Sequence, residues 1–407
     1  MKYVVFVAPF VGSTMLRCLQ AFLKLKQVRL GIITQQPYER LPKIVQNALK
    51  DHYQIQNCLD QNQLSIATQA FVKEWGRVDR LIGYLEHLQL PLAQVRSQLG
   101  IHGMKADVAK RFRDKNAMKE QLRQAGLPVA KQAKIHNAED VFEFIDRCNY
   151  PIVLKPLAGV GSKNTMRIQN EDELYAALNI LMPSQTNPVQ AEEFIQGEEH
   201  TMETVFIDGE CVWQSSTYYL PGPLKVIENP WIQYCVLLPK EQMRPHAKQF
   251  STQNIHALQA LGLRTGLSHM EWFLREKDPP QLVSEVGARP PGVNIMPLMS
   301  LAHDVDMWDK WAELMVHETW EMPKRSFAVA SAFLRAQGSG KTIQRIDGIQ
   351  EIQRQLAPLI AASSLPQIGQ PRSSHYEGDG WIILKHTDTK ALVDALRKVI
   401  TTIRITS

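Results

Sequence analysis

The chain has 407 residues, 44% of them hydrophobic, and its 46 Lys and Arg residues outnumber 41 Asp and Glu for a net charge of +5. This length predicts about two to four structural units, and the small, dispersed positive charge argues against nucleic-acid binding. Five scattered cysteines without C-x-x-C spacing argue against a disulfide framework or a zinc site. The first residues are too short an apolar run for a signal peptide, and no run of about 18 apolar residues occurs. We therefore expect a cytoplasmic enzyme that does not associate with membranes.

The N-terminal part of the chain alternates apolar strands with helices. Strands are predicted at 3–8, 28–34 and 80–83, and helices at 14–25 and 91–99. The β-α-β opening is typical of a doubly wound parallel α/β domain, which we assign to residues 1–103. No G-x-G-x-x-G sequence occurs in the first turn, so a dinucleotide site has little support.

A basic helix and a glycine-rich loop follow. Helical spacing of apolar residues predicts one helix over 106–125, with Lys115 near its middle. A strand then ends at Lys155, and the loop after it contains Gly159, Gly161 and Ser162. Glycines between two strands can adopt positive φ and expose N–H groups that cradle an anion. Because a strand follows, the loop is not a Walker A loop, and a plain turn is the alternative.

A hairpin near residue 278 places two acids face to face. Two apolar runs flank residues 276–280, and a turn centred near Asp278 sets Glu271 directly opposite Glu285. Cross-strand Cβ atoms lie about 5 Å apart, where like charges repel. A hard cation between two carboxylates would remove that repulsion, which indicates magnesium. Two solvated surface acids are the alternative.

The C-terminal part predicts a small α+β unit. Strands are expected at 327–334 and 380–385, and helices at 348–356 and 388–401. The sequence G-S-G-K-T at 338–342 is similar to part of a P-loop, but the first Walker glycine would fall on Arg335. We therefore interpret it as a turn.

Together these motifs resemble the ATP-grasp superfamily, in the branch of biotin carboxylase, the carbamoyl-phosphate synthetase large chain and the L-amino-acid ligases. The resemblance covers nearly the whole chain. It rests on R-D-K-N-A-M-K at 113–119, P-I-V-L-K-P at 151–156, E-E-F-I-Q-G-E-E at 192–199, K-V-I-E-N-P at 225–230 and E-V-G-A-R at 285–289.

The resemblance implies a role for each motif. Lys115 and Lys155 would hold the ATP phosphates, and the lid containing Gly159, Gly161 and Ser162 would fold over them. The adenine hinge would be formed by Glu192, Glu193, Phe194 and Ile195, with Glu199 on the ribose. Lys225 would contact phosphate or substrate. Glu271 and Glu285 would hold Mg²⁺, with Mn²⁺ as an alternative, and Arg289 would steady the oxyanion of the reacting acyl group.

The chain departs from the family pattern at one metal ligand. The family has Asn at the position of Gly287, which leaves a second metal ion in doubt. The hairpin pairing sets His269 opposite Gly287, and we hypothesise that His269 fills this space as a ligand through water or as a substrate contact. An imidazole hydrogen-bonded within the sheet is the alternative.

The implied fold is an α/β protein with a central ATP-grasp domain. We predict the parallel N-terminal domain at 1–103, a two-lobed ATP-grasp domain of antiparallel sheets and helices at 104–317 with a mobile lobe at about 128–191, and the C-terminal α+β domain at 318–407. The implied function is an ADP-forming ligase that joins a small carboxylate, an amino acid, to an amine. The alternatives are a ligase of purine or bicarbonate metabolism and a nucleotide-binding protein with impaired catalysis. A homodimer is expected through the resemblance alone.

Overall fold

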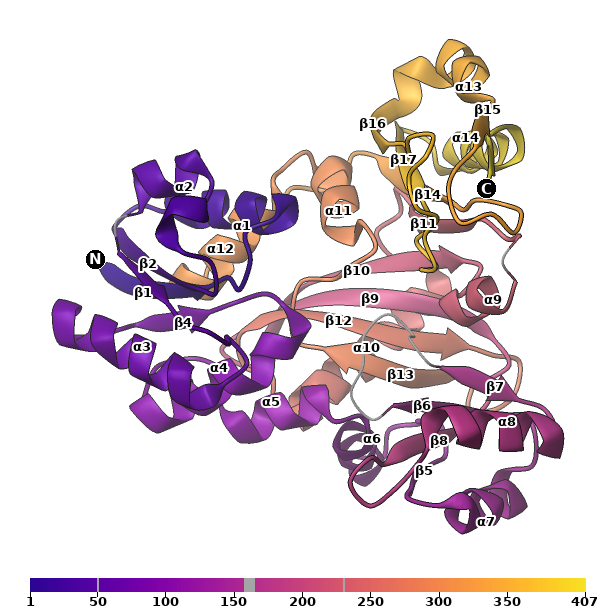
Figure 1. Ribbon diagram of the computed structural model, residues 1–407, viewed down its shortest axis with the longest axis horizontal. Helices are drawn as coiled ribbons and strands as arrows, with labels where there is room; N and C mark the ends of the chain where they lie inside the picture. Colours follow the sequence, from indigo (N-terminus) through magenta and orange to yellow (C-terminus); the bar gives the residue numbers. More distant parts are fainter. Residues whose placement is uncertain (50, 157–164, 230) are drawn as a thin grey trace.

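The computed structural model describes residues 1–49, 51–156, 165–229 and 231–407. Figure 1 shows three regions around a long central sheet: a purple N-terminal region, a magenta lobe and a yellow C-terminal region. The predicted α/β fold class is confirmed. No helix in the described ranges is long and apolar enough to cross a membrane. All five cysteines are free.

The N-terminal region is built on a parallel sheet with strand order β3-β2-β1-β4. Its centre is β1, in which Val4 to Val7 are fully buried, as the continuous apolar run predicts. The sequence prediction omits β3, α2 and α3, although Asp60 caps α3 with hydrogen bonds to the amides of Asn62 and Gln63. The elements are β1 (Lys2–Val7), α1 (Ser13–Leu23), β2 (Val28–Thr34), η1 (Tyr38–Arg40), α2 (Lys43–Ala48), β3 (His52–Gln54), α3 (Gln61–Trp75), β4 (Arg80–Ile82), η2 (Glu86–Leu88) and α4 (Gln89–Leu99).

The single helix predicted over 106–125 is wrong, because the chain forms two helices, α5 (Ala106–Arg113) and α6 (Lys115–Gln124). Asp114 separates them with an extended backbone, and its side chain accepts hydrogen bonds from the amides of Asn116 and Ala117. Asp114 is therefore the N-cap of α6, which places Lys115 at the first position of that helix.

The magenta lobe is a four-stranded antiparallel sheet with order β5-β8-β6-β7, covered by two helices (Figure 1). Both helices begin at an Asn N-cap, Asn137 and Asn170. The elements are β5 (Gln132–Ile135), α7 (Ala138–Cys148), β6 (Ile152–Pro156), β7 (Met166–Ile168), α8 (Glu171–Leu181) and β8 (Val189–Glu193). The predicted lid residues Gly159, Gly161 and Ser162 lie outside the described residues.

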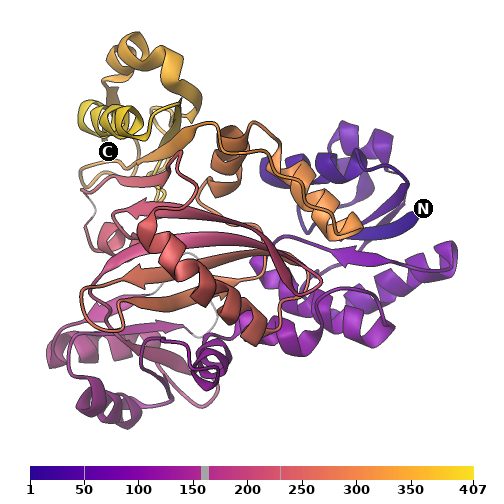
Figure 2. The same cartoon turned by 180° about the vertical axis from the view of Figure 1, so that it is seen from behind.

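The central sheet has eight strands in the order β13-β12-β9-β10-β11-β14-β17-β16, paired antiparallel throughout. Figure 2 shows α10 lying across the back of this sheet, where Phe250 stacks on Trp272 with ring centroids 4.3 Å apart. The elements are β9 (Glu198–Ile207), β10 (Glu210–Leu220), α9 (Pro223–Glu228), β11 (Tyr234–Leu238), α10 (Pro245–Leu261), β12 (Gly266–Leu274) and β13 (Gln281–Gly287).

The last part of the chain joins both neighbouring regions. Helix α12 (Met307–His317) packs against the N-terminal region, with the Trp311 ring 5.6 Å from Phe22. Strands β14 (Ala328–Leu334), β17 (Gly380–His386) and β16 (Ile360–Ser364) extend the central sheet, so the C-terminal region shares its hydrogen-bond ladder. The remaining elements are α11 (Ile295–His303), β15 (Arg345–Asp347), α13 (Ile349–Leu356), η3 (Ala357–Leu359), α14 (Thr389–Thr402) and β18 (Arg404–Thr406). No helix follows Gly338 to Lys341 directly, as predicted.

Candidate active site

The hairpin of β12 and β13 has the predicted register at its functional end. His269 pairs with Gly287, and Glu271 pairs with Glu285. A bulge follows Glu271, so that Trp272 pairs with Val283 nearer the turn. The two carboxylates therefore lie side by side on one face of the central sheet, as the pairing argument requires.

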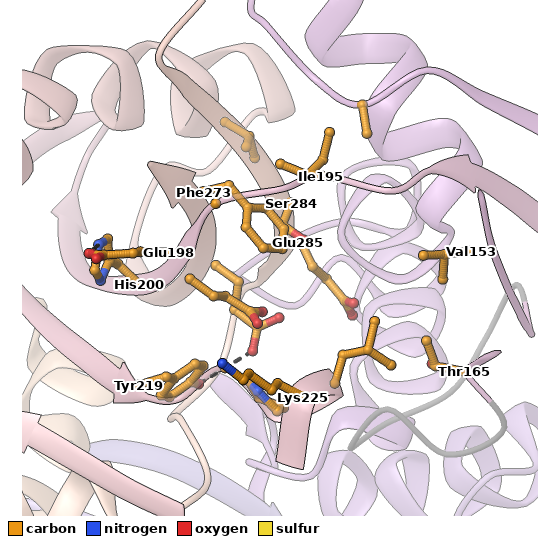
Figure 3. Close-up of a pocket in the computed structure, with 18 of the residues that line it drawn as sticks. Val153, Thr165, Ile195, Glu198, His200, Tyr219, Lys225, Phe273, Ser284 and Glu285 are labelled. Carbon is orange, nitrogen blue, oxygen red and sulfur yellow. Dashed lines mark hydrogen bonds and ion pairs between the residues drawn. The ribbon is translucent and has the colours of Figure 1, made fainter. Parts of the chain in front are cut away.

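This face of the sheet borders a cleft of about 2650 Å³ between the N-terminal region, the magenta lobe and the C-terminal region. Figure 3 shows Tyr219, Lys225 and Glu285 converging on it from β10, α9 and β13. Every predicted site residue within the described ranges lines this cleft: Lys115, Lys155, Glu192, Glu193, Phe194, Ile195, Glu199, Lys225, His269, Glu271, Glu285 and Arg289.

The hinge segment enters the cleft through a close backbone contact. A Cβ atom on Gly197 would lie 2.5 Å from the carbonyl oxygen of Leu274, so only glycine fits there. The Phe194 ring lies under the Arg167 guanidinium, 4.4 Å from the ring centroid. The side chain of Glu192 faces two lysines, so only its backbone is available for the expected adenine contact.

Glu192 bridges two buried lysines at the junction of α6 with the magenta lobe. Its Oε1 lies 2.6 Å from Nζ of Lys119, and its Oε2 lies 2.9 Å from Nζ of Lys155. Burial opposes ionisation of Glu192, but the two ammonium groups lower its pKa to about 2. Burial lowers the pKa of Lys119 to about 8, whereas Glu192 raises the pKa of Lys155 against the effect of burial. All three groups are therefore charged at neutral pH.

A cation already lies against one of the two facing acids. Nζ of Lys115 is 2.8 Å from Oε1 of Glu285. Burial, and after it the charge of Glu271, raises the pKa of Glu199 well above its ordinary value. Within the described ranges no three His, Cys, Asp or Glu side chains converge to hold a metal by themselves. The donor set thus suits an ion that shares its remaining ligands with phosphate and water, as Mg²⁺ does.

The N-terminal region contributes an acid that the sequence does not single out as functional. Glu86 lies 2.5 Å from Nη1 of Arg113 through Oε1, and its Oε2 contacts Nε of Arg289. Burial opposes ionisation of Glu86, but Arg289 and Arg113 lower its pKa. Glu86 follows the carboxyl end of β4, and ligands commonly bind at the carboxyl ends of strands in parallel sheets. Its place directly after this strand is the sequence feature that could have marked Glu86 as a site residue.

His269 takes part in a chain of buried polar groups. Its Nδ1 lies 2.9 Å from Oε1 of Glu203, and its Nε2 lies 3.7 Å from Oε1 of Glu271. Burial opposes protonation, but the two carboxylates raise the pKa of His269 to about 9. His269 is therefore hydrogen-bonded within the sheet, as the alternative interpretation has it, and it also lines the cleft. Its contact with a substrate or a metal ion stays a prediction.

Three tyrosines connect the C-terminal region to the acids. The Tyr219 hydroxyl donates to Oε1 of Glu271 over 3.3 Å. Its ring lies 5.8 Å from Tyr234, which in turn lies 5.4 Å from Tyr376 of the loop before β17. Tyr376 and Glu377 both line the cleft. No local pattern marks these residues, because only the tertiary fold brings them beside β12.

Known proteins resemble this chain in sequence and in fold. Residues 113–217 match the ATP-grasp (A) domain of phosphoribosylglycinamide synthetase. The chain is 25% identical over 299 residues to an L-arginine-specific L-amino acid ligase of Bacillus subtilis, which covers 72% of this chain and 71% of that protein. It is 25% identical over 242 residues to an alanine–anticapsin ligase of Bacillus subtilis (strain 168), covering 53% of this chain and about half, 49%, of that protein.

The fold agrees over the whole chain with a solved structure. An L-amino acid ligase from Bacillus licheniformis superimposes with a TM-score of 0.75 at 18% identity, covering 100% of this chain and 98% of that one. At this identity the match shows the fold. The chain is therefore similar to ATP-grasp ligases, by the family model over residues 113–217 and in fold over its whole length.

Proposed function

We propose that the cleft activates the carboxylate of an amino acid with ATP and joins it to an amine. The proposal depends mainly on one observation. Five charged residues from five different elements or loops line the same cleft: Lys115, Lys155, Arg289, Glu271 and Glu285. Cations around a hollow with two facing carboxylates suit phosphoryl transfer, which depends on positioning and charge stabilisation.

The reaction has two steps. A carboxylate oxygen of the substrate attacks the γ-phosphorus of ATP, and the bond from that phosphorus to the β–γ bridging oxygen breaks, giving an acyl phosphate and ADP. The amine nitrogen then attacks the acyl carbon, the bond to the phosphate oxygen breaks, and an amide, inorganic phosphate and a proton leave. Lys115 and Lys155 would offset phosphate charge, and Arg289 would hold the oxyanion of the second step.

Magnesium fits this site through Glu271 and Glu285, with manganese as an alternative. When bound, the ion would neutralise charge on the ATP phosphates. Lys115 would then exchange its contact with Glu285 for a contact with phosphate. Gly287 leaves the hairpin without a third ligand, so we propose two carboxylate ligands, with phosphate and water supplying the rest.

The other predicted residues take their roles in order along the cleft. The hinge from Glu192 through Glu193 and Phe194 to Ile195 would receive adenine, and Glu199 would bind the ribose hydroxyls. Lys225 on α9 would contact phosphate or the substrate carboxylate. His269 would contact substrate through Nε2.

The acidic rim of the cleft supports an amino-acid substrate. Glu377 and Tyr376 enter from the C-terminal region, and burial raises the pKa of the Glu377 carboxyl. A cationic group of a substrate would relieve that cost, and an aromatic ring beside it would add a cation–π contact. The L-arginine specificity of one relative makes arginine the first substrate to test.

The function is tested by incubating the protein with ATP, Mg²⁺ and pooled amino acids, with and without L-arginine, and assaying phosphate and dipeptides. Release of phosphate that depends on amino acids, with a dipeptide detected by mass spectrometry, supports the proposal. Turnover with bicarbonate or a purine-pathway amine instead would support the alternative ligase. Tight ATP binding without turnover in any of these mixtures would support the impaired nucleotide-binding protein.

A further inference from the structure

We propose that Glu203 is a positioning residue that holds Nδ1 of His269, so that Nε2 is the ring atom presented to substrate. The proposal rests on the proposed function only in naming the substrate as the group that Nε2 contacts. Glu203 belongs to none of the motifs on which the resemblance depends.

Glu203 lies inside the central sheet with no contact with solvent. It sits on β9, directly opposite His269 of β12 and Ser215 of β10, and its exposed fraction is 0%. A buried carboxylate is costly unless hydrogen bonds and a counter-charge compensate it. A residue at this place therefore needs specific partners, and the structure supplies them.

Three donors surround the Glu203 carboxylate. The Thr201 hydroxyl donates to Oε1 and the Thr217 hydroxyl to Oε2, each over 2.9 Å. Nδ1 of His269 lies 2.9 Å from Oε1. In the ranges that the structure describes, His269 is the sole ionisable side chain within ion-pair distance of Glu203. We assign the hydrogen of this contact to Nδ1, because both oxygens of Glu203 already accept hydrogen bonds from the threonine hydroxyls.

Because Nδ1 faces Glu203, Nε2 is the ring nitrogen left on the other side. Nε2 lies on the cleft side of the ring, 3.7 Å from Glu271, which lines the cleft. Across the hairpin, Gly287 contributes no side chain, and a Cβ atom there would lie 3.5 Å from Oε2 of Glu86 and 3.6 Å from Cγ of Arg289. His269, Glu271 and Arg289 line the same cleft, and we place the reacting carboxylate between them.

A carboxylate behind an imidazole fixes the orientation and the hydrogen-bonding role of the ring, and such partners strongly affect activity. Glu203 occupies this position toward His269. Because Thr201 and Thr217 hold both of its oxygens, Glu203 cannot rotate away, and His269 stays aimed at the cleft.

The test begins with the ring itself, in the full-length protein without nucleotide. Protein labelled with ¹⁵N-histidine is measured at one pH, and the His269 ring signals are assigned by their loss in His269→Gln. We expect a slowly exchanging Nδ1–H signal that changes in Glu203→Gln but not in Glu318→Gln, which removes the carboxylate beside His102. An unchanged His269 signal in Glu203→Gln would overturn the proposal.

Turnover then separates positioning from a merely structural role. With ATP, Mg²⁺ and pooled amino acids, we expect Glu203→Gln to lower kcat/KM for the amino acid by about tenfold and to leave KM for ATP unchanged. The double variant with His269→Gln should be no slower than His269→Gln alone, and a further tenfold loss would refute the positioning role. If Glu203→Gln does not fold, Thr217→Val removes one donor to Glu203 and should shift the same ring signal. The ring measurement decides the proposal even if the wild-type protein shows no ligase turnover.

Discussion

Replacing Lys119 with Met tests whether the bridged lysines stabilise the protein and prepare the nucleotide site. Lys119 is 1% exposed, and its ammonium shares Glu192 with Lys155. Removing one partner of a buried ion pair costs about 3–5 kcal/mol, and we expect about 3 kcal/mol because Lys155 still pairs with Glu192. Met nearly preserves the volume of Lys, so a cavity adds little.

The same change should weaken ATP binding. Without Lys119, the whole Glu192 charge falls on Lys155, which then attracts phosphate less. We expect the Kd for ATP to rise about tenfold, equivalent to about 1.4 kcal/mol.

Urea unfolding and titration with a fluorescent ATP analogue measure the two effects. Arg123→Met is the matched control, because Arg123 is exposed one turn further along α6. Adding Glu192→Gln to Lys119→Met also removes the carboxylate that pairs with Lys155 and should destabilise the protein further. Destabilisation of less than about 1 kcal/mol, or equal effects of Lys119→Met and Arg123→Met, would refute the reasoning.

Three further predictions follow from the site. Glu285→Gln should raise the Mg²⁺ concentration needed for half-maximal ADP formation. The control Glu276→Gln, in the exposed hairpin loop, should leave that concentration unchanged. Equal effects of the two variants would contradict the assignment of Glu285 as a metal ligand. Glu86→Gln should lower the melting temperature and the turnover together, because Arg289 and Arg113 lose a buried ion-pair partner. Wild-type values in both assays would count against this role of Glu86. The raised pKa of His269 means that its stabilising charge is fully present below pH 6.5 and is lost as the pH rises to about 9. We therefore expect the difference in unfolding free energy between wild type and His269→Gln to shrink by about 3 kcal/mol between pH 6.5 and about 9. Urea unfolding without metal measures this difference at each pH. A constant or growing difference would disprove the positive charge assigned to the His269 ring.

The hairpin shows how far sequence reasoning reached. Side chains alternate between the two faces of a strand, and the position of the hairpin turn determines which residues pair across it. Placing the turn near Asp278 was therefore enough to predict that Glu271 pairs with Glu285 and His269 with Gly287. The bulge after Glu271 was not predicted, since nothing in the local sequence marks it. It lies on the turn side of the two acids and leaves their pairing intact.

The errors and omissions have a common physical origin. Asp114 fits the helical pattern of its neighbours, and only its hydrogen bonds to the next two amides reveal a cap. Glu86 and Tyr376 reach the cleft, and Glu203 reaches His269 inside the sheet, from segments far apart in the chain. No spacing rule relates these residues. Motifs that carry their function within a few consecutive residues were found, and partners assembled across the fold were not.

The shared ladder between β11 and β14 has a consequence for synthesis of the chain. Tyr234 pairs with Phe333 and Leu238 with Val329, and all five residues of β11 are buried. When β11 leaves the ribosome, its partner strand has yet to be made, so an apolar strand edge stays open during translation. Truncation before β14 would make that edge permanent, and a fragment ending near residue 317 is expected to aggregate rather than fold as a free ATP-grasp unit.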